Sequence, residues 1–107
     1  VEIYGKYLGE DLAKNLPKVG VEFPLIIKKD GMEIPRAPLA KNSDGSLVFA
    51  GSIREGEEVT FGYGNLQVIL HSGQQIYDDV KIQNCESIFI YSCMARRRFM
   101  NEYVEKE

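Results

Sequence analysis

SIFIYSCMARRR, residues 87–98, is the stretch of sequence that decides the fold. Its first six residues form an apolar run of strand length, which predicts a central strand buried on both faces of a sheet. From Met94 to Lys106 the apolar residues recur at helical spacing, so a helix is expected to follow the strand at once. The stretch therefore indicates a fold that packs helices against a sheet.

Short helices and short strands are expected before this stretch. Residues 1–8 and 10–16 have helical patterns, with Gly9 suited to end the first helix and Pro17 to end the second. A longer helix is expected over 66–80, with Asn65 as its N-cap. Turn-forming residues separate four expected strands, at 23–27, 33–40, 47–50 and 58–61.

The order of these elements predicts the fold class. Two helices come first, then a group of strands, a helix, one further strand and a last helix. Strands that follow one another through short turns pair in antiparallel fashion. We therefore expect one α+β domain over residues 1–107, with a mostly antiparallel sheet and helices packed against it. Two prolines, Pro35 and Pro38, predict an edge position or a bulge for the strand at 33–40.

Composition excludes several classes of protein. The 107 residues are 44% apolar, which is enough for a core without disulfides or metals, and the net charge is −3. The only basic run is Arg96-Arg97-Arg98, so a nucleic-acid partner is not expected. No apolar run approaches the roughly 18–20 residues of a membrane-spanning helix, so no membrane span is expected.

The number of cysteines indicates the cellular compartment in which the protein is found. Cys85 and Cys93 are the only cysteines, fewer than a secreted disulfide scaffold of this length usually has. If residues 87–92 form a strand, the two sulfur atoms lie too far apart to bond. Free thiols indicate a reducing compartment, and a cytoplasmic location is expected. The chain opens on Val1 without a signal peptide, so we expect it to be a fragment of a longer polypeptide.

Cys93 is the strongest candidate for a reactive side chain. At the start of a helix, beside Arg96 and Arg97, a thiol is favoured in its thiolate form. A cysteine enzyme also needs a base, and the only histidine, His71, lies in the middle of another helix. We therefore expect no enzyme activity and assign Cys93 a structural or ligand-contacting role. A redox-sensing thiol and a catalytic thiol are the alternatives.

Metal and phosphate sites are not expected. One histidine and no C-x-x-C pair do not provide the spacing of a zinc site. Gly62-Tyr63-Gly64 lies between a strand and a helix, but Gln67 replaces the third glycine of a dinucleotide loop. We interpret these glycines as an ordinary strand-to-helix turn and expect no cofactor.

Two arginines are candidates for binding an anion. Arg96 is expected near free backbone N–H groups at a helix start, where a guanidinium provides a seat for a carboxylate. Arg36 stands alone in an otherwise apolar strand. The alternatives are a solvated helix face for the arginine run and a side chain that extends to solvent for Arg36.

The order of motifs along the chain resembles the C-terminal part of the FIST domain. The most specific stretch is residues 88–97, an apolar strand followed by Ser-Cys, two residues and Arg. Other segments agree in order and spacing: Leu8-Gly9, Phe23-Pro24-Leu25, Arg36, Asp44-Gly45-Ser46-Leu47 and Ile53-Arg54-Glu55-Gly56.

This resemblance implies a function. FIST domains are viewed as sensory input modules of signal-transduction proteins, mainly bacterial, and are proposed to bind small ligands such as amino acids. Carried onto this chain, the family pattern makes Arg36, Cys93 and Arg96 the ligand-binding residues. It implies three partners: a small-molecule ligand such as an amino acid or a carboxylate, the N-terminal half of the FIST module, and an attached output domain. Alternatives are an interaction or dimerisation scaffold that forms a homo-oligomer, and a thiol enzyme or redox switch at Cys93.

Overall fold

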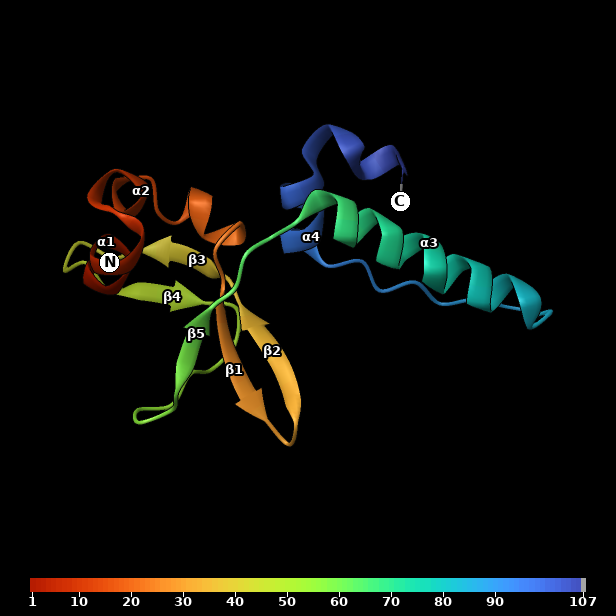
Figure 1. The fold of residues 1–107 in the computed structure, drawn as a ribbon, viewed down its shortest axis with the longest axis horizontal. Coiled ribbons are helices and arrows are strands. Elements are labelled where there is room, and N and C mark those ends of the chain that lie inside the picture. Colours follow the sequence, from red (N-terminus) through yellow and green to blue (C-terminus); the bar gives the residue numbers. More distant parts are fainter. Residues whose placement is uncertain (107) are drawn as a thin grey trace. The chain divides into compact units, whose positions relative to one another are not determined.

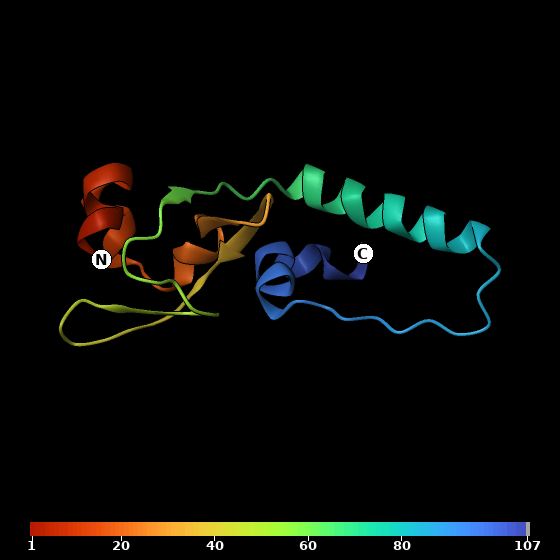
Figure 2. The same ribbon diagram turned by 90° about the horizontal axis from the view of Figure 1, so that it is seen from below.

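The structure is a computed structural model that describes residues 1–106. It divides into two compact units, Val1–Tyr63 (unit 1) and Gly64–Glu107 (unit 2), and each is described here by itself. Figures 1 and 2 show the elements of both. That residues 1–107 form a single domain stays a prediction.

Unit 1 begins with short helices. These are α1 (Glu2–Leu8), α2 (Glu10–Lys14) and the 3-10 helix η1 (Lys18–Val21). Gly9 separates α1 from α2 with a φ of 97°, a backbone conformation that glycine adopts at little cost. The two predicted helices are confirmed, although α2 ends two residues earlier than expected, before Pro17.

A three-stranded antiparallel sheet follows. Its strands are β1 (Leu25–Lys29), β2 (Met32–Arg36) and β5 (Val59–Phe61), in the order β2-β1-β5. Asp30 and Gly31 connect β1 to β2 with φ values of 53° and 76°, as in a tight hairpin turn. The sequence pattern predicted all three regions as strands, with bounds that differ by at most two residues for β1 and β5.

A second sheet pairs β3 (Pro38–Lys41) with β4 (Leu47–Phe49) in antiparallel fashion. The expected single strand at 33–40 was therefore wrong, since the chain leaves one sheet after Arg36 and enters the other at Pro38. The register shifts between Pro38 and Ala40, which is the bulge that the prolines predicted. Proline lacks an N–H to donate, so a region with two prolines does not sustain one continuous ladder.

The hydrophobic core of unit 1 lies where α1 and α2 meet the sheets. Tyr4 is 1% exposed, and its ring meets the ring of Phe61 edge to face, with centroids 5.0 Å apart. The buried residues of this cluster are Tyr4, Ala13, Leu16 and Leu25. Around them pack half-buried apolar side chains from the helices of unit 1, from β4 and β5 and from connecting segments: Val1, Leu8, Leu12, Val19, Phe23, Leu47, Phe49, Ile53, Val59 and Phe61.

Unit 2 consists of helices and an extended connection. Its helices are α3 (Leu66–Ile82), α4 (Met94–Met100) and the 3-10 helix η2 (Asn101–Lys106). The predicted cap of α3 is confirmed, because Asn65 Oδ1 accepts a hydrogen bond from the backbone N–H of Val68 at 3.2 Å. The single helix expected over 94–106 changes character at Asn101, whose φ of 45° ends the α-helical hydrogen bonding.

The strand expected at residues 87–92 was wrong. These residues form an extended connection between α3 and α4 without strand pairing. Phe89, Ile90 and Tyr91 are 84%, 85% and 95% exposed. A strand requires a neighbour that completes its backbone hydrogen bonds, and within the described part of unit 2 there is no sheet to provide one. The residue types are those of a strand, but the predicted strand does not form.

The fold class is confirmed as α+β with antiparallel sheets. In the described part of the chain, none of the helices combines the length and the apolar character needed to cross a membrane.

Candidate functional site

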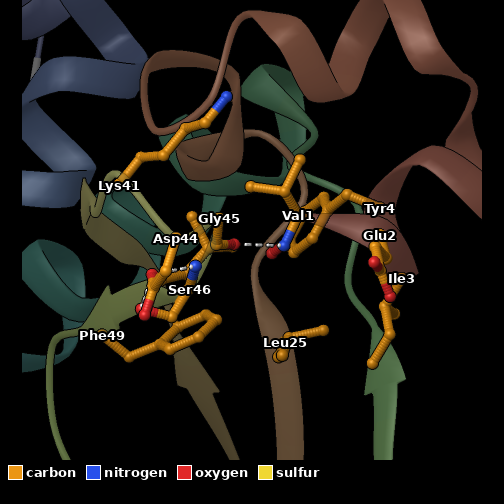
Figure 3. Close-up of a pocket in the computed structure, with 11 residues that line it drawn as sticks. Val1, Glu2, Ile3, Tyr4, Leu25, Lys41, Asp44, Gly45, Ser46 and Phe49 are labelled. Atoms are coloured by element: carbon orange, nitrogen blue, oxygen red, sulfur yellow. Dashed lines mark hydrogen bonds between the residues drawn. The ribbon is translucent and has the colours of Figure 1, made fainter.

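Unit 1 contains a concavity of about 620 Å³ beside α1 and the β3–β4 hairpin. Figure 3 shows its lining residues, which come from α1, from β1 and from both strands of the hairpin and the turn that joins them. The lining is Val1, Glu2, Ile3, Tyr4, Leu25, Lys41, Asp44, Gly45, Ser46, Leu47 and Phe49. Most of its surface is apolar, with a few charged groups near the turn.

The turn at residues 42–46 fixes the polar side of this concavity. Asp44 accepts hydrogen bonds from the hydroxyl of Ser46 at 2.7 Å and from its backbone N–H at 2.8 Å (Figure 3). These two bonds lower the pKa of the Asp44 carboxyl below its usual value, because they favour the charged form, and the bond from the hydroxyl has the larger effect. The amino group of Val1 donates to the carbonyl oxygen of Gly45 at 3.0 Å, which ties α1 to the turn.

Arg36, the first predicted site residue, lies at the end of β2 in unit 1. Its Nε donates to the carbonyl oxygen of Ser52 at 3.3 Å, and its Nη1 donates to that of Pro35 at 3.4 Å. Gly51, with a φ of 108°, lies against the guanidinium so closely that an added Cβ would stand 2.9 Å from Cζ. The side chain is half-buried and holds the loop at residues 51–52 against the end of β2.

Cys93, the second predicted site residue, is the N-cap residue of α4 in unit 2. Its thiol is free and exposed, and it makes no capping hydrogen bond. The predicted position at the start of a helix is thus confirmed, whereas the residues before it are not a strand.

Arg96, the third predicted site residue, lies in the first turn of α4 and is half-buried. Its Nη2 donates to the carbonyl oxygen of Ile69 in α3 at 2.9 Å. The guanidinium therefore connects α4 to the main chain of α3 inside unit 2. Arg97 and Arg98 are exposed, so most of the basic run is a solvated face.

A comparison with protein families gives one decisive observation: the FIST C domain matches residues 1–107. The chain belongs to the FIST C domain family. This family consists of sensory domains of signal-transduction proteins. The membership predicted from residues 88–97 and the accompanying segments is thereby confirmed. No curated protein and no solved structure matches the chain.

In this FIST C domain the three predicted site residues are distributed over both units. Cys93 and Arg96 share the first turn of α4, while Arg36 lies in unit 1. The concavity of unit 1 is lined by none of the three. A joint ligand site formed by Arg36, Cys93 and Arg96 stays a prediction.

The residues of the concavity were not predicted from the sequence of this FIST C domain. The composition of residues 42–46 indicates a turn, and Tyr4 falls on the apolar stripe of the helical pattern at residues 1–8. Neither signal shows that the turn lies beside α1, because that contact joins residues 44 positions apart. Among residues 1–106, no group of three or more His, Cys, Asp or Glu side chains is arranged to hold a metal ion.

Proposed function

We propose that this FIST C domain binds a small ligand, such as an amino acid or a carboxylate, and that binding biases an output domain attached to it. The observation that supports the proposal is the concavity of unit 1, whose volume of about 620 Å³ suits a small molecule. Ligand pockets commonly have about 300–1,000 Å³, mostly apolar walls and a few polar groups that orient the ligand. The concavity has this composition.

The lining suggests which parts of a ligand would be recognised. Ile3, Leu25 and Phe49 provide apolar contact for a hydrocarbon side chain. Lys41 extends a flexible ammonium that can pair with a carboxylate, and the Asp44 carboxylate can accept hydrogen bonds from an amino group. An amino acid with an apolar side chain matches both sets of groups.

Signalling requires more than binding. A ligand shifts an equilibrium between two conformations only when it binds one of them more tightly. We therefore propose that the ligand-bound conformation of the domain differs in its contacts with the output domain. The N-terminal half of the FIST module is a further proposed partner.

We propose that the domain acts by binding rather than by catalysis. Cys93 is exposed, and within the described residues no hydrogen bond joins its thiol to His71, which is exposed on α3. A thiol nucleophile needs a base within hydrogen-bonding reach. The two free thiols also support the proposal of a reducing, cytoplasmic compartment.

Ligand binding is tested by a thermal-shift screen of amino acids and small carboxylates, followed by calorimetric titration of each compound that raises the melting temperature. In the concavity, Lys41→Gln should weaken binding by about 1.5–3 kcal/mol, the usual contribution of a charged hydrogen bond. The matched control is Lys28→Gln, since Lys28 is an exposed lysine of β1 that pairs with Glu33 at 3.9 Å.

The same titration separates the two candidate sites. If Arg36→Ala and Arg96→Lys weaken binding while Lys41→Gln does not, the ligand binds at the residues that the family resemblance implies. If no compound of the screen raises the melting temperature, ligand sensing by this domain is contradicted. The melting temperature of each unliganded variant is measured as well, because Arg36 and Arg96 make structural hydrogen bonds.

An interaction scaffold is the second candidate function. One observation favours it: unit 2 exposes a continuous apolar segment, Ile88–Tyr91, whose side chains are 59–95% exposed. Monomeric proteins seldom leave such a run of large apolar residues in water.

A further inference from the structure

The exposed segment of residues 87–92 has the composition of a strand but no partner. It contains Ile88, Phe89, Ile90 and Tyr91, all residue types enriched in strands, and it is extended between α3 and α4 (Figures 1 and 2). Among the described residues, no backbone hydrogen bond connects residues 86–92 to another segment. The segment therefore leaves both its backbone groups and its large side chains in water.

The chemistry of the segment specifies the kind of surface that would bind it. Successive side chains of an extended chain point to opposite sides, so Ile88 and Ile90 share one side and Phe89 and Tyr91 the other. Both sides are apolar. A peptide of this kind is stabilised by the open edge of a sheet, which supplies backbone hydrogen bonds, with apolar contacts for its side chains.

This chain itself provides such an edge. In the order β2-β1-β5, the two outer strands are β2 and β5. β2 includes Glu33, which is charged, and Pro35, which has no N–H to donate. Both features oppose pairing of another strand with the outer side of β2. β5 consists of Val59, Thr60 and Phe61, without a charge or a proline, and Thr60 is exposed.

We propose that residues 87–92 of one chain pair with the outer edge of β5 of a second copy, in a symmetric dimer. Each chain has both the segment and the β5 edge, so a two-fold dimer contains this contact twice.

The buried area is sufficient for a stable dimer. A buried aromatic side chain contributes about 150–250 Å², so the four aromatic side chains of two segments, Phe89 and Tyr91 in each, cover roughly 600–1,000 Å². With the surface they cover, the total falls in the range of about 1,200–2,000 Å² found in stable interfaces.

The first test measures association of the 107-residue chain by sedimentation velocity over a series of protein concentrations. The proposal expects a monomer–dimer equilibrium whose dissociation constant rises at least about tenfold in Ile90→Lys, a change of about 1.4 kcal/mol. The control is Ile82→Lys, because Ile82 is an isoleucine of unit 2 with a similar exposure, 79% against 85% for Ile90. Circular dichroism checks that both variants fold. A chain that is monomeric at every concentration, or equal effects of the two variants, would overturn the proposal.

The second test locates the contact by cross-linking. Both natural cysteines are replaced by serine, and single cysteines are introduced by Thr60→Cys in one preparation and Phe89→Cys in another. Mild oxidation of the mixture should give a covalent dimer that contains one chain of each kind, and this supports the proposal. A mixture that gives no mixed dimers would overturn the proposal. So would a third preparation, which carries both substitutions in one chain, if its disulfide forms only within single chains. Neither readout involves a ligand, so this inference and the proposed sensing function can fail independently.

Discussion

Tyr4 joins α1 to the sheets by two kinds of contact. Its ring packs edge to face on Phe61, and its hydroxyl donates to the carbonyl oxygen of Phe23 at 2.8 Å. Burial raises the pKa of the Tyr4 hydroxyl to about 12, since the phenolate would lose its hydration. One side chain therefore couples the start of the chain to β5 and to the residues before β1.

The raised pKa of Tyr4 predicts how stability depends on pH. Below pH 10 the hydroxyl is protonated in both the folded and the unfolded chain. Between pH 10 and about pH 12 the unfolded chain loses this proton while the folded chain retains it, so the free energy of unfolding falls as the pH rises. The contribution is about 1.4 kcal/mol for each pH unit. Urea unfolding at several pH values measures it.

Tyr4→Phe isolates this effect. The variant should be less stable at neutral pH by about 0.5–1.5 kcal/mol, the net contribution of the lost hydrogen bond. It should also lose stability less steeply above pH 10 than the wild-type chain does. Tyr7→Phe is the control, because Tyr7 lies in the same helix with 65% exposure. If Tyr4→Phe and the wild type show parallel pH profiles, the hydroxyl of Tyr4 is not responsible.

At the scale of single elements, α3 depends on its cap. Asn65 accepts a hydrogen bond from the backbone of Val68, and none of the helix's own residues is buried. Asn65→Ala should therefore destabilise α3 by about 0.5–2 kcal/mol. Asn65→Asp should retain or increase stability, because a carboxylate accepts the same bond and interacts favourably with the helix N-terminus. Thermal unfolding, monitored by circular dichroism, compares the two variants with the wild type. Equal melting temperatures for Asn65→Ala and the wild type would contradict a stabilising cap.

The elements also show how far the sequence predicts this structure. Local signals sufficed where the neighbours are close in sequence: Asn65 caps α3, Asp30 and Gly31 turn the β1–β2 hairpin, and Pro38 accompanies a bulge. The segment at 87–92 has strand-forming residue types, but the described part of unit 2 contains no sheet with which it could pair. Strand pairing is a property of two segments, so a pattern in one of them cannot establish it.

The candidate site was less accessible to prediction than the elements. The helix start at Cys93 follows from local sequence, whereas the hydrogen bond from Arg96 to Ile69 joins residues of two helices that are 27 positions apart in the sequence. The concavity of unit 1 depends in the same way on a long-range contact, between Val1 and Gly45. Such long-range contacts depend on how the elements pack, and the periodicity of apolar residues in the sequence does not predict them.

At the scale of the whole molecule, burial is divided unevenly between the two units. Among the residues whose burial the structure describes, the buried apolar residues of unit 1 are Tyr4, Ala13, Leu16, Leu25, Ile27 and Ala37, whereas unit 2 has Met100 alone. β1 is paired on both sides, by β2 and by β5. α3, in contrast, exposes Ile76 and Tyr77 of its apolar stripe to 64% and 58%. Segments with few buried contacts open at lower free energy than the core.

Hydrogen exchange should therefore distinguish the units. We expect the amides of β1 at Ile26 and Ile27 to exchange at least about tenfold more slowly than those of α3 at Ile76 and Tyr77, a difference of at least about 1.4 kcal/mol in opening free energy. The comparison is made at low protein concentration, where the proposed dimer dissociates. Repeating it at high concentration is informative, because pairing of residues 87–92 would slow their exchange. If α3 is as well protected as β1 at low concentration, both units open in one cooperative step and the uneven burial does not set local stability.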